Sequence, residues 1–173
     1  MNITLTSAAT MLALVLSARA ADVTTKLSNV HLCCNSCVTG VKKAVGAVQG
    51  AAADVDKDAG TVTLTGPDKA TVQKAADALT SAGYFGASSN PDIKIDASTG
   101  AKGEKVQTLK VEGVHLCCSS CVRAVNDALK DVPGVKSQTA QRGAKSFEVT
   151  GDFNDKDVFA ALQKEGLTGK AGK

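Results

Sequence analysis

The sequence contains very few aromatic side chains. It has no tryptophan, one tyrosine and four phenylalanines in 173 residues. The net charge is only +3, and no long basic run is present, so the chain lacks both the stacking groups and the phosphate-binding surface of a nucleic-acid-binding protein. No Ser-His-Asp set, pair of catalytic carboxylates or phosphate-binding loop is present either. The sequence therefore predicts neither a nucleic-acid-binding protein nor an enzyme.

Long hydrophobic runs are also lacking. The apolar stretch TSAATMLALVLS at residues 6–17 is shorter than the roughly 20 residues needed to span a bilayer. Small residues follow at Ala18 and Ala20, with the spacing that a signal peptidase requires. We expect residues 1–20 to be a signal peptide that is cleaved after Ala20. The mature chain would then be periplasmic or secreted, without membrane insertion, in a compartment that oxidises unprotected thiols.

Cysteine and histidine are confined to one nine-residue sequence motif that occurs twice, which we call the repeated phrase. VHLCCNSCV at residues 30–38 and VHLCCSSCV at 114–122 hold all six cysteines and both histidines of the chain. The similarity continues beyond them: CVTGVKKAVGAVQG at residues 37–50, which starts at the last cysteine of the first phrase, aligns without a gap with CVRAVNDALKDVPG at 121–134. The sequence therefore predicts two homologous metal-binding units at residues 22–88 and 105–173. We expect residues 89–104, rich in Ser, Gly, Lys and Asp, to be a largely flexible linker in which residues 92–96 can add a strand.

The hydrophobic period changes along each unit. An extended, partly alternating segment comes first, and apolar residues at spacings of three and four follow the cysteines, as in an amphipathic helix. Two short strands are expected near 52–57 and 60–65, then a second helix over 68–82 and a short last strand. The buried residues expected in this second helix are Val72, Ala75, Ala76 and Leu79. The order βαββαβ predicts an α+β fold of two tandem ferredoxin-like domains, each an antiparallel sheet with helices on one face.

Each phrase contains a Cys-x-x-Cys pair where a strand turns into a helix. Cys34 and Cys37 are three residues apart, as are Cys118 and Cys121, so both sulfurs of a pair can reach one ion. The second cysteine of each pair falls in the first helical turn, where free N–H groups favour a thiolate. Thiolates are the ligands that soft metal ions select.

The residues just before each pair are further candidate donors. Side chains two apart in an extended segment face the same side, so an inward Leu32 turns its two neighbours outward. The same holds around Leu116 in the second unit. Adjacent cysteines tend to diverge, however, which limits how many donors of one unit converge. The additional candidate ligands are Cys33, Cys117, His31 and His115.

These features resemble the heavy-metal-associated domain family, which includes periplasmic mercury-binding proteins, copper chaperones and N-terminal domains of heavy-metal-transporting ATPases. Its motif is Gly-Met-Thr-Cys-x-x-Cys at a strand-to-helix turn of a βαββαβ fold. The first unit is most similar to the mercury-binding proteins and copper chaperones, through CVTGVKKAV and TVQKAADALTSAGY. The resemblance implies sequestration or hand-over of metal ions, with a metal transporter or another metal-binding domain as partner. The ligands that it implies are Cys34, Cys37, Cys118 and Cys121.

Both copies depart from the family motif, since His-Leu-Cys replaces Gly-Met-Thr. Three sulfurs suit three-coordinate Cu(I) or Hg(II), whereas three sulfurs and an imidazole suit tetrahedral Zn(II). We expect Cu(I), with Hg(II) and Zn(II) as alternatives. In the family the loop after the second helix lies near the metal. Tyr84 and Leu167 occupy that place in the two units, so the two sites are expected to differ.

Other roles for the cysteines remain open at this point. Cys-x-x-Cys pairs in exported proteins also serve as structural disulfides or redox pairs, so a thiol-disulfide redox protein is the alternative function. Haem attachment is excluded, because Val38 and Val122 follow the last cysteine where that motif needs histidine. The two loops can act independently, or a flexible linker can let the two Cys-x-x-Cys pairs share one ion.

Overall fold

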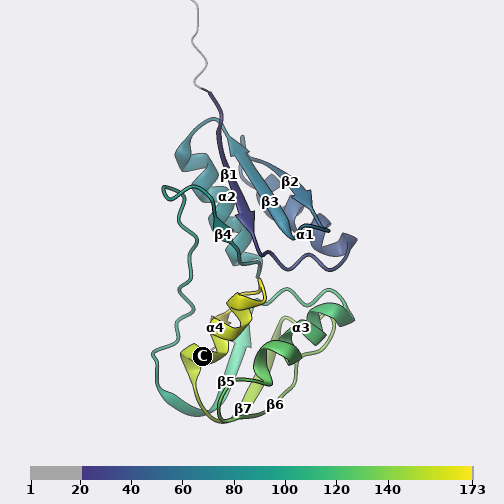
Figure 1. The fold of residues 1–173 in the computed structure, drawn as a ribbon, viewed down its shortest axis with the longest axis vertical. Coiled ribbons are helices and arrows are strands. Elements are labelled where there is room, and N and C mark those ends of the chain that lie inside the picture. Colours follow the sequence, from purple (N-terminus) through teal and green to yellow (C-terminus); the bar gives the residue numbers. More distant parts are fainter. Residues whose placement is uncertain (1–20, 173) are drawn as a thin grey trace, which may run out of the picture.

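The computed structural model describes residues 21–172, so the predicted signal peptide lies outside the described residues. Two α+β units follow one another along the chain (Figure 1). The first contains β1 (Val23–Ser28), α1 (Asn35–Gly46), β2 (Ala52–Asp56), β3 (Thr61–Gly66), α2 (Lys69–Ser81) and β4 (Ala87–Ser88). The second contains β5 (Lys105–Glu112), α3 (Ser119–Leu129), β6 (Val135–Gln138), β7 (Ser146–Asn154), α4 (Asp155–Lys164) and β8 (Lys170–Ala171).

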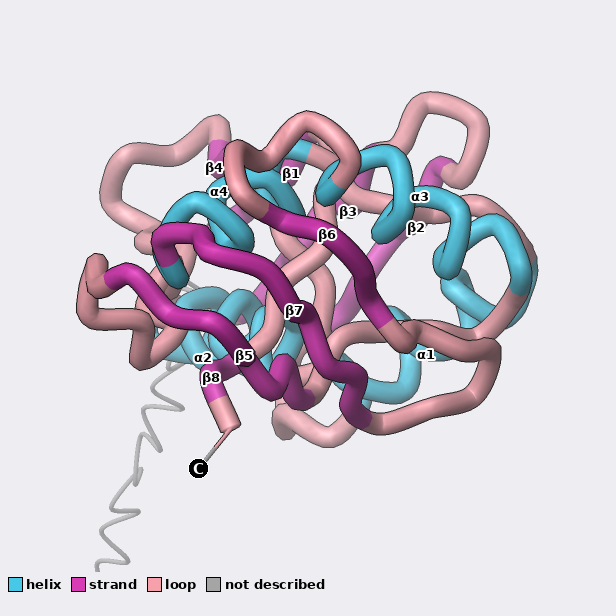
Figure 2. The backbone as a smooth tube through the Cα atoms, turned by 90° about the horizontal axis from the view of Figure 1, so that it is seen from below, coloured by secondary structure: helices cyan, strands magenta, loops and turns pink. Residues whose placement is uncertain are grey.

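Each unit has its own four-stranded antiparallel sheet. The strand orders are β2-β3-β1-β4 and β6-β7-β5-β8, with the first strand of each unit paired to both its third and its last. In each unit the two helices pack against each other, and α1, α2 and α4 also pack against strands. Figure 2 shows the β5, β6 and β7 strands of the second sheet side by side. The predicted fold class, two ferredoxin-like βαββαβ units, is confirmed.

Helix α2 shows how local sequence sets an element and its buried face. The Asp68 carboxylate accepts a hydrogen bond from the Thr71 N–H at 2.7 Å and caps the first turn. The helix ends just before Gly83, whose φ of +88° is a left-handed conformation that favours glycine. The four residues predicted to be buried in this helix are all buried: Val72, Ala75, Ala76 and Leu79. This apolar face packs into the core of the first unit.

The loops that follow α2 and α4 pair directly and join the two units. The Phe85 N–H donates to the Gly166 carbonyl at 3.0 Å, and the Thr168 N–H donates to the Gly83 carbonyl at 3.1 Å. Between them Tyr84 and Leu167 form an antiparallel β-bridge. The units therefore touch through backbone hydrogen bonds at equivalent positions of the repeat.

The first half of the predicted linker is docked on the first unit. The Gln73 side chain accepts from the Lys94 N–H at 2.8 Å and donates to the Lys94 carbonyl at 2.7 Å. Ile93, an apolar residue within a polar stretch, is only 2% exposed. The strand that residues 92–96 could add is absent, because one buried side chain and one amide hold this part of the segment against α2. The linker itself stays a prediction.

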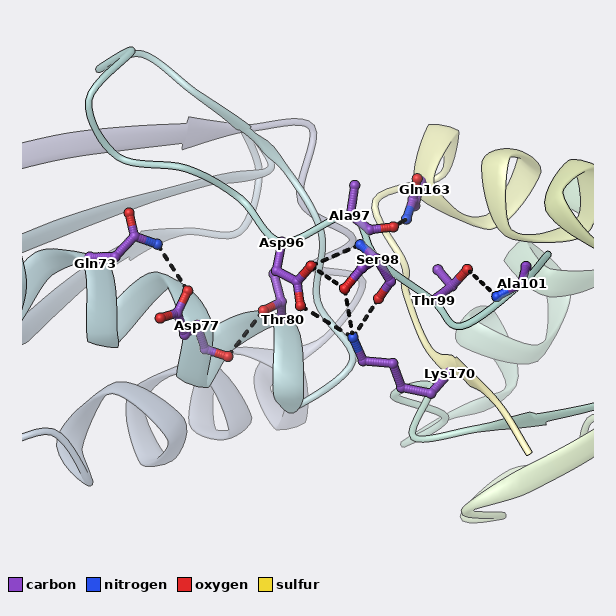
Figure 3. A network of polar contacts seen from close by, with 10 residues as sticks. All are labelled: Gln73, Asp77, Thr80, Asp96, Ala97, Ser98, Thr99, Ala101, Gln163 and Lys170. Carbon is purple, nitrogen blue, oxygen red and sulfur yellow. Dashed lines mark hydrogen bonds and ion pairs between the residues drawn. The ribbon is translucent and has the colours of Figure 1, made fainter. Parts of the chain in front are cut away.

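The second half of this segment is held by the second unit. Gln163 donates to the Ala97 carbonyl at 3.1 Å, and the Lys170 ammonium lies 3.2 Å from an Asp96 carboxylate oxygen (Figure 3). The buried Asp155 carboxylate accepts hydrogen bonds from the N–H groups of three consecutive residues at 2.7–3.0 Å, namely Lys102, Gly103 and Glu104. The segment thus runs along both units with a fixed path. The unit boundaries inferred from the sequence stay predictions.

Within residues 21–172, no helix combines the length and the apolar composition that a membrane crossing requires.

Candidate metal centre

The repeated phrase follows the first strand of each unit and forms an extended loop. Val30 and Leu32 are buried in the first unit, and Val114 and Leu116 are buried in the second. The residues that alternate with them are only partly buried. The predicted inward orientation of Leu32 and Leu116 is confirmed. It turns the histidine and the first cysteine of each phrase away from the core.

The next residue begins the helix. Cys34 is the N-cap of α1, with φ −160° and ψ 170°, and Cys118 is the N-cap of α3 with nearly the same backbone conformation. Cys37 and Cys121 lie one turn later and are 0% exposed. Because Cys34 is fully extended, its side chain and that of Cys33 leave the backbone on opposite sides. The two adjacent cysteines of each unit therefore leave the backbone in different directions.

The two phrases meet across the interface between the units. The Cys33 sulfur lies 3.2 Å from the Cys118 sulfur and 3.4 Å from the Cys121 sulfur. Cys118 and Cys121, the Cys-x-x-Cys pair of the second unit, are themselves 3.8 Å apart. The additional cysteine of the first unit therefore completes a triangle of sulfurs with the pair of the second unit.

The same arrangement recurs with the units exchanged. The Cys117 sulfur lies 3.5 Å from both the Cys34 and the Cys37 sulfurs, and Cys34 and Cys37 are 3.8 Å apart. All these distances exceed the roughly 2.05 Å of a disulfide, and all six thiols are free. We call the six sulfurs the thiol cluster; its members are Cys33, Cys34, Cys37, Cys117, Cys118 and Cys121.

Both histidines border the thiol cluster. A ring nitrogen of His31 lies within 4.8 Å of the Cys33 and Cys121 sulfurs, and His115 lies close enough to Cys37 to act to lower the pKa of its thiol. The Nε2 atoms of both histidines are buried without a hydrogen-bond partner, which is costly unless another group or an ion satisfies them. Burial lowers the pKa of His31, against an opposing effect of Glu165, so this imidazole is held in its neutral, metal-binding form.

The acidity of the thiols differs from the prediction. Contact with Cys121 and burial raise the pKa of Cys37, although it lies in the first helical turn. At Cys118 burial also acts to raise the pKa. There the backbone N–H groups of Cys121 and Ser120 and the Cys33 thiol outweigh burial, and lower the pKa to about 6. The Cys118 sulfur at the N-cap thus lies near the free N–H groups of α3, whereas the Cys121 side chain in the first turn is buried in the core.

Tyr84 contacts the centre from the loop after α2. Its hydroxyl donates to the Cys37 carbonyl at 3.0 Å, and its ring stacks on His115 of the other unit with 4.6 Å between ring centroids. Its ring fits because residue 40 is glycine, since a Cβ there would collide with the Tyr84 hydroxyl. The counterpart Leu167 is fully buried and has no polar atom to offer. The two units therefore differ at this loop by one hydrogen bond to the backbone, and the expected difference in metal affinity stays a prediction.

The structure brings together all eight side chains that the sequence suggested as donors. Their assignment as metal ligands stays a prediction. Sequence reasoning anticipated loops that can share an ion through the Cys-x-x-Cys pairs, but it did not anticipate that four sulfur contacts across the interface would involve Cys33 or Cys117. It also missed Gly83 and Gly166 as the contact points. Their only sequence signal is a glycine at the same place in both units.

Comparisons with known proteins support the family resemblance in part of the chain. The sequence model of the heavy-metal-associated domain family matches residues 108–168. Among solved structures, the N-terminal domain of PacS from Synechocystis PCC6803 is 20% identical, with a TM-score of 0.36, over 39% of this chain and 100% of that domain. The apo heavy-metal-associated domain of the copper chaperone for superoxide dismutase is 23% identical, with a TM-score of 0.36, over 44% of this chain and 78% of that one.

A structure with two domains is also similar. The N-terminal soluble domains of Bacillus subtilis CopA are 16% identical, with a TM-score of 0.31, over 88% of this chain and 95% of that one. No curated protein sequence matches the chain.

Proposed function

We propose, from the premise that residues 108–168 form a heavy-metal-associated domain, that this chain binds soft metal ions at the thiol cluster. A domain of this family with clustered cysteines indicates heavy-metal binding. The observation that carries the proposal is that six free thiols from two units converge on one place. Soft ions select thiolate ligands over oxygen, and the metal is cargo rather than a resident cofactor.

Cu(I) is the ion that we propose first. The candidate donor groups within residues 21–172 contain only cysteine and histidine, so no carboxylate is available for a hard ion. Groups of three sulfurs satisfy Cu(I) or Hg(II), whereas Zn(II) takes four donors and would need a fourth sulfur or a histidine beside each group of three. Zn(II) and Hg(II) therefore stay as alternatives that one metal titration can separate.

The proposed role is sequestration or hand-over. Cys37 and Cys121 are buried, while the other four cysteines are partly exposed and can exchange with an incoming thiol. Solvent-open pockets adjoin the centre on both sides, one lined by Cys33 with Lys57 and the other by Cys117 with Lys145. A metal transporter or another metal-binding domain can thus exchange thiolates with the cluster one at a time. We propose no catalytic role.

We also propose that the chain acts after export, in the periplasm or outside the cell. This proposal rests on the sequence of residues 1–20 alone. It requires that the thiols stay reduced, or that bound metal protects them, in an oxidising compartment.

Anaerobic mass spectrometry under native conditions tests the proposal. The reduced chain from residue 21 onward would be offered Cu(I), Hg(II) and Zn(II) in turn, in the presence of a competing chelator. We expect Cu(I) to be retained, with X-ray absorption showing coordination by sulfur. Loss of every soft ion to a weak chelator, together with rapid reduction of insulin disulfides, would instead support the thiol-disulfide redox function.

A further inference from the structure

The additional cysteine of each unit lies against the Cys-x-x-Cys pair of the other unit. One triangle of sulfurs joins Cys117 to Cys34 and Cys37, with edges of 3.5, 3.5 and 3.8 Å. Every edge of this triangle is a direct sulfur contact. Two of its members come from the first unit and the third is supplied by the second unit.

The second triangle reverses the roles of the units. It joins Cys33 to Cys118 and Cys121, with edges of 3.2, 3.4 and 3.8 Å. The two triangles together use each of the six cysteines once. The Cys33 sulfur also lies 3.7 Å from the Cys37 sulfur, and the Cys117 sulfur lies 3.7 Å from the Cys121 sulfur, so the triangles lie side by side.

The size of each triangle fits a three-coordinate soft ion. With metal–sulfur bonds of about 2.3 Å, a planar three-sulfur site has sulfur–sulfur edges of about 4.0 Å. The observed edges of 3.2–3.8 Å are shorter, and the sulfurs need to separate by a few tenths of an ångström up to about 0.8 Å. No change in the connectivity of the cluster is needed.

A set drawn from the first unit alone is less suited to the same task. Cys33 immediately precedes Cys34, whose extended backbone directs the two side chains to opposite sides. Cys33 does approach Cys37 at 3.7 Å, but its contacts with the second unit are shorter. In the second unit, Cys117 lies 3.7 Å from Cys121 and forms a group with Cys118 and Cys121, but its contacts with the first unit, at 3.5 Å, are shorter. The additional cysteine is thus positioned for its neighbour unit more than for its own.

We infer that the chain holds two crossed trithiolate sites, each formed by the Cys-x-x-Cys pair of one unit and the additional cysteine of the other. This inference rests on the proposed function and specifies its sites. The first two equivalents of Cu(I), or of Hg(II), bind one to each site. His115 adjoins the first site and His31 the second. Each crossed site takes its third sulfur from the other unit, which accounts for both the additional cysteine and the duplication.

Two triple variants of the full chain separate crossed sites from single-unit sites. The crossed variant, Cys33→Ser/Cys118→Ser/Cys121→Ser, keeps Cys34 and Cys37 with Cys117. The single-unit variant, Cys117→Ser/Cys118→Ser/Cys121→Ser, keeps the same pair with Cys33. Both retain three thiols and one intact Cys-x-x-Cys pair, so they differ only in which unit supplies the third sulfur. Circular dichroism of both checks that the fold is retained.

We expect the crossed variant to bind one Cu(I) with three sulfurs by X-ray absorption. The single-unit variant should show two sulfurs and bind at least about tenfold more weakly, which corresponds to about 1.4 kcal/mol. Equal affinities, or three-sulfur coordination only in the single-unit variant, would overturn the crossed sites while leaving the proposed function intact. Failure of the unmodified chain to retain any soft ion would overturn both.

The mirror-image pair repeats the comparison if either triple variant fails to fold. Cys34→Ser/Cys37→Ser/Cys117→Ser keeps the crossed set around Cys33, and Cys33→Ser/Cys34→Ser/Cys37→Ser keeps the three cysteines of the second unit. The same order of affinities and sulfur counts is expected. The reverse order would overturn the crossed sites.

Discussion

Replacing Gly83 and Gly166 by alanine should separate the two units and weaken soft-metal binding while each unit stays folded. A Cβ at Gly83 would collide with the Gly113 carbonyl oxygen and lie 2.5 Å from the backbone nitrogen of His115. A Cβ at Gly166 would collide with the equivalent groups of the first unit. It would collide with the Asn29 carbonyl oxygen and lie 2.5 Å from the backbone nitrogen of His31. Both obstacles are backbone atoms, so rotation of a side chain cannot relieve them.

The size of the effect follows from these contacts. An ordinary Cβ contact begins near 3.4 Å, so the facing backbones must move apart by close to 1 Å. The sulfur contacts across the interface, now 3.2–3.5 Å, would lengthen by a similar amount. Each alanine also costs about 1 kcal/mol for its positive φ. A loss of about tenfold or more in Cu(I) affinity, or about 1.4 kcal/mol, is therefore expected.

Competition titration with a Cu(I) chelator measures this loss, and nuclear magnetic resonance of the Tyr84 and His115 rings reports whether the two rings still stack. Gly100→Ala is the matched control. Its φ is +79°, close to those of the two interface glycines, but a Cβ there would lie 3.9 Å from its nearest neighbour. The control should lose stability without losing affinity. An unchanged Cu(I) affinity in a double variant whose Tyr84 and His115 rings no longer stack would refute the reasoning that the interface assembles the centre.

Three further predictions concern single residues. Tyr84→Phe should lower the free energy of unfolding by about 1 kcal/mol in urea titrations, because a buried hydrogen bond to the Cys37 carbonyl is removed; no change would contradict this. Asp155→Asn should cost about 2 kcal/mol, since a buried carboxylate that accepts three N–H groups loses its charge. Those N–H groups outweigh burial and lower the pKa of Asp155, so its contribution is present above the unfolded pKa of about 3.9 and is lost as pH falls towards the folded value; a parallel pH dependence of wild type and variant would argue against it. In the metal-free reduced protein, Cys118 should react with iodoacetamide with a midpoint near pH 6, whereas Cys33 should stay unreactive well above that pH, as peptide mass spectrometry can show.

The chain by itself determined the fold of each unit and the identity of the candidate donors. The spacing of Val72, Ala75, Ala76 and Leu79 defines a helical face whatever lies opposite it, because side-chain periodicity is local to the backbone. The alternation of side chains in an extended segment likewise predicted that Leu32 and Leu116 are buried in the core and that their sequence neighbours point away from it. Confinement of every cysteine to two phrases was enough to locate the centre.

The acidity of the thiols could be inferred only from the tertiary structure. Proximity to a helix N-terminus suggested a thiolate at Cys37, yet burial and contact with Cys121 act in the other direction. Both of these effects come from packing. The fixed path of residues 89–104 also depended on packing, because nothing in a Ser- and Gly-rich stretch indicates that Ile93 finds a buried position or that Gln73 pairs with Lys94.

The pairing of cysteines between units was decided only by the tertiary structure. Cys33 and Cys118 are separated by 85 residues, and their contact depends on how two preformed surfaces meet. That meeting is set by a few backbone contacts at Gly83 and Gly166, where the absence of a Cβ lets the main chains approach. A repeat in the sequence predicts that two similar units exist. Which sulfur of one unit faces which sulfur of the other follows from their relative orientation, which no local period encodes.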